Sequence, residues 1–432
     1  MKFHKLLVLL FAALLFPSIL MAQLPRTKQF REQYRLQQVV VLSRHNIRSP
    51  LSDYGSVLAR MTPHAWTEWT SAPSELTLRG GLLETMMGQF FRQWLVQEQM
   101  FCENTAPTID ELNIYANSMQ RTIATAQYFS TGFLPVANLR VYHRFDVGKM
   151  DPVFFPRLTK VSDAFRDKAM TQIAEMGGKN GIKGISEKLK DNYALTAKVL
   201  GMTNSIAYKK GEIKGFRNDD TEIIFNLNEE PQMRGTLKLA NSASDAFILQ
   251  YYEEPDSVKA AFGHSLTLSD WEKIAQIKDV YGDVLFAAPI VAVNVAHPLL
   301  VYIDDELQAT HRKFTFLCGH DSNIASVCAA LGVEPYELPQ SIEKKTPIGG
   351  KLVFEKWVDK DGKQYVALNM VYQSTRQLRN IEMLSLQCPP MVYPLRLSGL
   401  KTNSDGLYAA EEVNQRFKEA INAYDDINTF ER

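Results

Sequence analysis

The pattern of hydrophobic and polar positions along the chain predicts an α/β protein. Unbroken apolar runs at residues 39–42 and 314–318 are typical of strands buried on both faces of a sheet. Residues 74–97 carry a large apolar side chain at every fourth position, which predicts an amphipathic helix packed on that sheet. The members of this apolar stripe are Leu82, Met86, Phe90 and Trp94.

Further segments extend the same sheet and its flanking helices. Residues 112–115 predict a strand that leads into a helix beginning near Arg121. Residues 346–357 and 365–374 predict two strands joined by a tight Asp-Lys-Asp-Gly turn, and residues 409–424 predict a final surface helix. The expected fold is a central mixed sheet flanked by helices.

Residues 151–263 follow a different pattern, with more helix formers, more charge and little strand alternation. Helices are expected near residues 182–193 and 243–254. We therefore predict a smaller inserted all-α cap domain at 151–263. The segments before and after it, 23–150 and 264–432, are expected to form the α/β domain together.

Polar residues predict where two later helices begin. Ser269 with Glu272 is the expected capping box of a helix that starts near Asp270. Ser322 is expected to cap the helix after the apolar run at 314–318, and Gly332 to end it.

Charge and the amino-terminal segment restrict partners and location. Lysine plus arginine and aspartate plus glutamate both number 48, so the formal net charge is zero and nothing indicates a nucleic acid or membrane partner. Residues 1–22 predict a secretory signal peptide, because Lys2 and Lys5 precede an uncharged apolar stretch that is short for a bilayer and broken by Pro17. A periplasmic or secreted protein, free of the membrane after cleavage, is expected.

The four cysteines are Cys102, Cys318, Cys328 and Cys388. Cys318 and Cys328 lie in apolar runs, where free thiols act as small hydrophobic side chains, so core thiols are favoured over disulfides. The chain has no Cys-X-X-Cys or Cys/His spacing typical of zinc sites, and no metal or other cofactor is expected.

The loop after the first apolar run carries side chains suited to a phosphate ester. Arg44 and Arg48 present planar guanidinium groups that bind phosphate oxygens in a bidentate way. His45 is a competent nucleophile when neutral and can hold a phosphoryl group covalently. Pro50 restricts Ser49 to extended conformations and stiffens the end of the loop. A basic surface loop is the alternative, and a short motif alone does not exclude it.

A second polar pair follows the apolar run at 314–318. His320 and Asp321 would stand at the carboxyl end of a strand and the amino end of a helix, where open α/β sheets bind ligands and helices attract phosphate. Helix capping by Asp321, with His320 packed beside it, is the alternative. Two junctions of this kind in one chain favour an anion site.

These motifs resemble the signature of the histidine acid phosphatases (histidine phosphatase superfamily, branch 2), which is Arg-His-X-X-Arg-X-Pro near the amino end and His-Asp near the carboxyl end. The chain is most similar to the bacterial periplasmic glucose-1-phosphatase branch, because the motif reads RHNIRSPL, with Asn46 where phytases and many other members carry glycine. The stretches YANSMQRTIATAQYF, DAFILQYYEE, GHDSNIAS and TPIGGKLVFEKW resemble the same branch. The resemblance covers nearly the whole mature chain and implies a phosphoglycerate-mutase-like sheet.

The resemblance also implies roles for individual residues. His45 would be the nucleophile that becomes phosphohistidine, and Asp321 the general acid that protonates the leaving alcohol. The implied phosphate-binding residues are Arg44, Arg48, Arg121 and His320, and the implied substrate-binding residues are Glu230 and Leu51. Without the resemblance, Arg121 would be an ordinary solvated helix arginine.

The implied function is that of a phosphomonoesterase for sugar phosphates, above all glucose 1-phosphate, which needs no metal because arginines supply the positive charge. The open alternatives are a broad-specificity acid phosphatase or phytase, a phosphoglycerate-mutase-like phosphotransferase, and a non-catalytic phosphosugar-binding protein. Related enzymes carry paired cysteines where this chain has Leu400 and Leu407, which puts inherited disulfides in doubt. An acidic pH optimum is expected, because the arginines should lower the pKa of Asp321 while its first role needs the protonated form.

Overall fold

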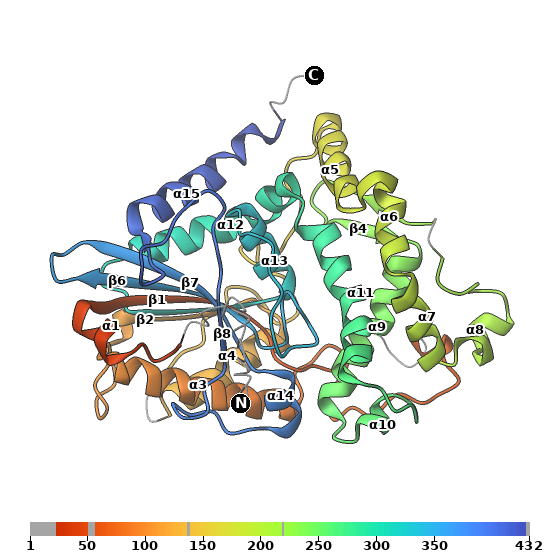
Figure 1. The fold of residues 1–432 in the computed structure, drawn as a ribbon, viewed down its shortest axis with the longest axis horizontal. Helices are drawn as coiled ribbons and strands as arrows, with labels where there is room; N and C mark the ends of the chain where they lie inside the picture. Colours follow the sequence, from red (N-terminus) through yellow and green to blue (C-terminus); the bar gives the residue numbers. More distant parts are fainter. Residues whose placement is uncertain (1–22, 51–56, 136–138, 218–219, 429–432) are drawn as a thin grey trace, which may run out of the picture.

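The structure, a computed structural model, describes residues 23–50, 57–135, 139–217 and 220–428. The predicted signal peptide and Leu51 lie outside the described residues. A seven-stranded mixed sheet has the order β2-β5-β1-β6-β7-β8, with β9 paired to β7 (Figure 1). Its strands are β1 (Tyr34–Arg44), β2 (Leu112–Ala116), β5 (Phe314–Gly319), β6 (Lys351–Asp359), β7 (Gln364–Tyr372), β8 (Met391–Pro394) and β9 (Tyr408–Ala409). β5 lies between β1 and β2 and runs parallel to both, whereas β1, β6, β7 and β8 pair antiparallel in turn.

Helices cover both faces of the sheet (Figure 1). Val39 and Val41 of β1 pack in one core with the helices α3 (Leu78–Gln97) and α4 (Gln120–Phe133). Val40 and Leu42 belong to a second core with α12 (Pro289–Gln308), α13 (Asp321–Ala330) and α15 (Ala410–Asn422). Successive strand residues point to opposite faces, so burial of both faces explains the unbroken apolar run.

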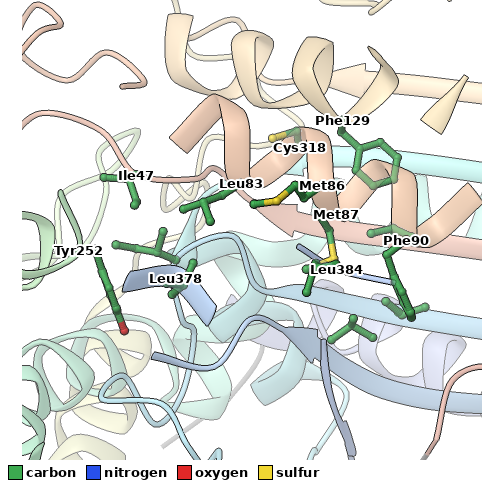
Figure 2. Close-up of a cluster of buried hydrophobic side chains, with 14 of the residues drawn as sticks. Ile47, Leu83, Met86, Met87, Phe90, Phe129, Tyr252, Cys318, Leu378 and Leu384 are labelled. Atoms are coloured by element: carbon green, nitrogen blue, oxygen red, sulfur yellow. The ribbon is translucent and has the colours of Figure 1, made fainter. Parts of the chain in front are cut away.

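The cluster in Figure 2 joins α3 to the strands and to Ile47 in the loop after β1. Met86, Phe90 and Trp94 are buried as predicted, but Leu82 is 47% exposed, so its place in the stripe was wrong. A helix turns once in about 3.6 residues, so a stripe of every fourth residue drifts around the helix. The buried face is wider than the stripe and includes Leu83.

A mainly helical part lies beside the sheet (Figure 1). Its longer helices are α5 (Asp163–Met176), α6 (Gly181–Lys188), α7 (Lys190–Val199), α9 (Thr236–Glu253) and α11 (Leu268–Phe286), with a small hairpin of β3 (Glu222–Ile224) and β4 (Gln232–Arg234). The single helix expected at 182–193 is two helices that meet at Leu189. The third core joins α5, α6, α7 and α9 to α11 and α12. The domain division at 151 and 263 stays a prediction.

The remaining short elements are α1 (Lys28–Gln33), α2 (Val57–Arg60), α8 (Ile206–Lys209), α10 (Ser257–Ala260) and α14 (Thr375–Asn380), and the 3₁₀ turns Ile109–Glu111, Gly178–Asn180, Met202–Asn204 and Asp425–Asn428. Within the described ranges no single helix is long and apolar enough to span a membrane, and the one pair that reaches this length together, α11 with α12, is bent by 83°.

Two local expectations meet different outcomes. Cys318 and Cys328 are buried free thiols, as predicted, and Cys102 and Cys388 are also unpaired. The capping box of α11 is Thr267 with Asp270, not Ser269 with Glu272, because the helix already begins at Leu268.

Candidate active site

The sheet brings the two predicted motifs together at the carboxyl ends of its parallel strands. Arg44 at the end of β1 pairs with Gly319 at the end of β5, and the His45 amide donates to the Gly319 carbonyl at 3.1 Å. His45 and His320 therefore follow adjacent strands, and their ring centroids lie 5.5 Å apart. This edge is where open α/β sheets bind ligands.

A cavity of about 310 Å³ opens at this edge. The predicted site residues that line it are His45, Arg48, Arg121, Glu230, His320 and Asp321. Arg44 is not among its lining residues, and Leu51 lies outside the described part of the chain.

His45 is held as a neutral imidazole with one free nitrogen. Its side chain is buried, and Nδ1 lies 2.8 Å from the Asn46 carbonyl oxygen. A carbonyl only accepts hydrogen bonds, so Nδ1 carries the proton and Nε2 keeps its lone pair. Burial, then Arg121 and the neighbouring charges, hold the pKa of His45 well below 6.5. The nucleophilic form therefore persists in mild acid.

His320 has the same tautomer as His45, with the proton on Nδ1, but it is fixed through the other ring nitrogen. Asn117 Oδ1 accepts the amides of Ser118 (2.8 Å) and Asp151 (2.9 Å), which turns its Nδ2 toward His320 Nε2 at 2.7 Å. Nε2 thus accepts, and Nδ1 carries the proton beside Arg121 Nη2, 3.5 Å away. Burial and Arg121 lower the pKa of His320 well below 6.5. The N–H groups of His320 Nδ1 and Arg121 Nη2 thus lie side by side with no acceptor between them, an arrangement that suits a bound anion.

Of the three arginines, Arg48 and Arg121 line the cavity, whereas Arg44 does not. Arg48 donates to Asp245 at 2.9 Å, and Arg121 has no carboxylate at ion-pair distance within the described residues. Burial and Arg48 lower the pKa of Arg121 to about 10, which still leaves it charged in acid. The buried Nε atoms of both have no hydrogen-bond partner in the described structure. Unpaired buried donors are rare, and a phosphate oxygen would satisfy them.

Arg44 is engaged below the cavity rather than in it. Its Nη1 donates to Glu343 Oε1 and to the Thr346 carbonyl, both at 2.6 Å, and its Nη2 lies 3.7 Å from Asp321 Oδ2. Burial lowers the pKa of Arg44, but Glu343 and Asp321 outweigh it and raise the pKa above its usual value. Its direct contact with phosphate stays a prediction.

Asp321 is held as a carboxylate at the amino end of α13. Its Oδ2 lies 2.5 Å from Lys278 Nζ of α11. Burial raises its pKa, but Lys278, Arg44 and His45 together lower it well below 3.8. The residue that caps α13 is His320, whose amide donates to Asn323 Oδ1 at 2.9 Å, so the predicted cap by Ser322 was wrong.

Further carboxyl groups also line the cavity. Glu230, Asp279 and Asp283 are lining residues, and burial is the first cause that raises the pKa of each, that of Asp279 to about 7. Hydroxyl groups can donate to such carboxyl groups or accept from them.

A buried network supports residues 45–50, the loop after β1 that carries the proposed nucleophile (the nucleophile loop). Lys351 Nζ donates to Glu84 Oε1 at 2.7 Å, and Glu84 Oε2 accepts from Asn46 Nδ2 at 2.9 Å. The Gly349 amide donates to the His45 carbonyl at 3.2 Å. Gly349 has φ 66°, and a Cβ there would lie 2.6 Å from Asn46 Nδ2. Asn46, whose carbonyl fixes the His45 tautomer, is therefore held through its side chain and through the peptide that precedes it.

Sequence reasoning missed Lys278, Asn117, Asp245, Glu84 and Glu343. Asn117 follows β2 directly, and the rule that ligands lie beyond strand ends could have indicated it. The other four have no local signal, because their roles depend on contacts between distant elements.

The fold and the paired histidine junctions define an α/β protein that gathers two histidines and two arginines in one cavity at the carboxyl ends of its parallel strands. The chain belongs to the histidine phosphatase superfamily (branch 2), whose family description matches residues 35–371.

Among curated relatives, the chain is 38% identical to a glucose-1-phosphatase of Providencia rettgeri over 97% of this chain and 99% of the relative. It is 40% identical to a glucose-1-phosphatase of Salmonella typhimurium over 90% of this chain and 93% of the relative. Among solved structures, a Hafnia alvei phytase in its apo form matches with a TM-score of 0.82 and 27% identity, with 90% of this chain and 97% of the phytase covered. The predicted family and the fold class, a mixed sheet flanked by helices, are confirmed, whereas the part expected to be all-α also contains the β3–β4 hairpin.

Proposed function

We propose that this protein is a phosphomonoesterase that hydrolyses sugar phosphates, above all glucose 1-phosphate, through a covalent phosphohistidine. The observation that carries the proposal is the arrangement of His45: its Nδ1 is engaged by a carbonyl, which leaves Nε2 with its lone pair, and the residue lines a cavity together with Arg48, Arg121 and His320. Family membership and the two glucose-1-phosphatase relatives support the reaction class.

The first step is in-line attack. His45 Nε2 bonds to phosphorus while the bond from phosphorus to the sugar oxygen breaks. Arg48, Arg121 and the Nδ1 proton of His320 stabilise the equatorial oxygens, and such pre-oriented donors are the main source of rate enhancement. Asp321, in its protonated form, donates a proton to the departing oxygen and is left as a carboxylate that can take up the proton of the attacking water. Water then attacks the phosphohistidine and releases phosphate.

The charges of the cavity favour a single phosphate on an uncharged polyol. Its lining cations are Arg48, Arg121, Lys278 and Lys345, and its lining carboxyl groups are Glu230, Asp245, Asp279, Asp283 and Asp321. Whether ionised or protonated, the carboxyl groups add no positive charge. A phytate with six phosphates would therefore meet few free cations, whereas sugar hydroxyls would find hydrogen-bond partners.

The same residues could serve a broader acid phosphatase or a phytase, and the 26% identical Phytase AppA of Escherichia coli keeps that alternative in view. A non-catalytic phosphosugar-binding protein would not need the free His45 nitrogen. We further infer that the protein acts in the periplasm or outside the cell after loss of residues 1–22, as the periplasmic branch that the sequence resembles does.

The test compares phosphate release from glucose 1-phosphate, phytate and p-nitrophenyl phosphate at pH 5 in the presence of a chelator. The proteins are the mature chain, His45→Ala and the control His311→Ala, which changes an exposed histidine outside the cavity. Glucose 1-phosphate should be the best substrate, and only His45→Ala should be inactive. Preference for phytate or the aryl ester would refute the assignment of a sugar phosphate as substrate. An active His45→Ala variant would refute the phosphohistidine mechanism.

A further inference from the structure

Asn241 is a cavity residue whose side chain has an unused hydrogen-bond acceptor. It lies in the second turn of α9, lines the cavity and is partly buried. Its Oδ1 atom is buried and has no hydrogen-bond partner among the described residues. A buried polar atom left unpaired costs free energy, so nearly all such atoms in native proteins are paired with protein, solvent or ligand. The Asn241 amide oxygen is therefore available to a ligand in the cavity.

The unpaired atoms of the cavity call for two different kinds of partner. In the described structure, three buried polar atoms of lining residues have no hydrogen-bond partner: Arg48 Nε, Arg121 Nε and Asn241 Oδ1. The two Nε atoms are donors and suit phosphate oxygens. The amide oxygen only accepts, so an ionised phosphate oxygen cannot satisfy it. It needs a donor on another part of the ligand.

Helix α9 places Asn241 beside the phosphate-binding groups. Asn241 and Asp245 are four residues apart, so their side chains are neighbours on one face of the helix. Asp245 accepts from Arg48 Nη2 at 2.9 Å and so fixes one of the arginines that would bind phosphate. One helix turn is about 5 Å, which is within reach of the hydroxyl groups of a hexose attached to that phosphate.

The lysines that line the cavity are engaged elsewhere. Lys278 Nζ donates to Asp321, and Lys345 Nζ lies 5.2 Å from the centroid of the Tyr336 ring. Donation by either lysine to Asn241 would cost the contact that it already makes. A hydroxyl group of the substrate meets no such cost, because it can rotate its hydrogen toward the amide oxygen.

We propose that Asn241 is a specificity-determining residue, which accepts a hydrogen bond from a hydroxyl group of the sugar and so selects sugar phosphates over esters that lack this hydrogen. The inference rests on the proposed phosphatase function and adds a second sugar contact, on α9, to the one proposed for Glu230. A buried acceptor discriminates mainly by rejecting ligands that leave it unpaired.

The test combines variants of Asn241 with substrates that each lack one hydroxyl group. The substrates are glucose 1-phosphate, its deoxy analogues without the hydroxyl group at C2, C3, C4 or C6, and p-nitrophenyl phosphate. Asn241→Leu keeps the size of the side chain and the smaller Asn241→Ala avoids any steric clash, and neither side chain accepts a hydrogen bond. For each protein and substrate, kcat/KM is measured because it reports discrimination between substrates.

The expected result is a loss that depends on one hydroxyl group. In the wild type, one deoxy analogue should have a kcat/KM about tenfold below that of glucose 1-phosphate. Asn241→Leu and Asn241→Ala should lower kcat/KM for glucose 1-phosphate by about tenfold, but should lower that for the same deoxy analogue no further. The value for p-nitrophenyl phosphate, whose leaving group has no hydroxyl group, should change at most about twofold.

Two further variants serve as controls. Asn241→Asp keeps the shape and the acceptor, so it should still reject the same deoxy analogue, and any cost of its added charge should be shared by all substrates. Ser242→Ala changes the next residue of α9, which is not among the lining residues and whose Oγ donates to the Lys238 carbonyl at 3.2 Å. It should leave kcat/KM for every substrate unchanged.

The outcomes separate this inference from the function on which it rests. Equal losses for all substrates in Asn241→Leu and Asn241→Ala would show a structural role for Asn241 and overturn the proposal. Variants that discriminate against every deoxy analogue as the wild type does would also overturn it. A wild type that prefers p-nitrophenyl phosphate to glucose 1-phosphate would instead refute the proposed sugar-phosphate function, before any variant is compared.

Discussion

The buried ion pair under the nucleophile loop allows a quantitative test of how the site is held. Glu84 and Lys351 are both 0% exposed, and their Oε1 and Nζ atoms lie 2.7 Å apart. Lys351 also donates to Ser43 Oγ at 3.0 Å and to the Gly349 carbonyl at 3.1 Å. Glu84 has Asn46 as its second partner. Each charge therefore depends on the other for neutralisation.

Removal of one partner leaves an unpaired charge in a dry core. Lys351→Met and Glu84→Leu should each lower the free energy of unfolding by about 3–5 kcal/mol. The double variant Glu84→Leu/Lys351→Met removes both charges, and well-packed apolar replacements of such pairs are often neutral or stabilising by about 1–4 kcal/mol. The two single losses together exceed the loss in the double variant by at least about 6 kcal/mol, which is the coupling energy expected from the double-mutant cycle.

Urea unfolding followed by tryptophan fluorescence measures all corners of the cycle. The exposed pair Arg60–Glu212 provides the control, because Arg60→Met should cost at most about 1 kcal/mol. The double variant should regain stability but not full activity, because the Asn46 side chain has lost its acceptor on Glu84. A His45 displaced as a result could cost up to about 10²-fold in kcat. Single-variant losses that simply add in the double variant would refute the coupling, and an unchanged kcat would refute the positioning role.

Three further outcomes are expected. Burial and Arg121 hold the pKa of His45 well below 6.5, so the neutral imidazole is lost only well below that pH. The fall of kcat/KM for p-nitrophenyl phosphate on the acid side should therefore lie well below pH 6.5. A fall between pH 6 and 7 would contradict the assignment of neutral His45 as the nucleophile. Asn117→Leu removes the donor to His320 Nε2 and should lower kcat by up to about 10²-fold. It also leaves the buried amides of Ser118 and Asp151 without their acceptor, so the free energy of unfolding should fall by about 1–3 kcal/mol or more. Unchanged steady-state kinetics in the folded variant would show that the tautomer is fixed in another way. Glu230→Gln should raise KM for glucose 1-phosphate about tenfold, since a hydrogen bond to a charged group is worth about 1.5–3 kcal/mol. KM for p-nitrophenyl phosphate, which has no sugar, should stay unchanged. An equal rise for both substrates would refute the proposed contact between Glu230 and the sugar.

The sequence predicted the parts of the fold and site that depend on local patterns. Strands β1 and β5 are buried on both faces, so their apolar runs stand out, and the polar residues directly after them could be assigned to one edge. Arg121 is a different case: its place at the start of α4 was foreseen, but only the family resemblance gave it a role.

Residues whose environment is made by distant elements could not be found this way. Glu84 lies in an amphipathic helix, where a charged residue normally indicates the solvent face, yet it is fully buried because Lys351 of β6 meets it. Lys278 is one lysine on a charged helix until α11 packs beside α13 and brings it to Asp321. The engagement of Arg44 by Glu343 likewise depends on a loop about 300 residues away in the chain.

The central claim, covalent catalysis by His45, is tested most directly by trapping the intermediate. Glucose 1-phosphate labelled with radioactive phosphate is mixed with the enzyme and quenched rapidly, and the protein is analysed for label that is stable in alkali and labile in acid, as expected of phosphohistidine. The label should appear before phosphate is released, map to His45 and be absent from His45→Ala. Release of phosphate with no labelled protein at any time, or label at another residue, would contradict the mechanism.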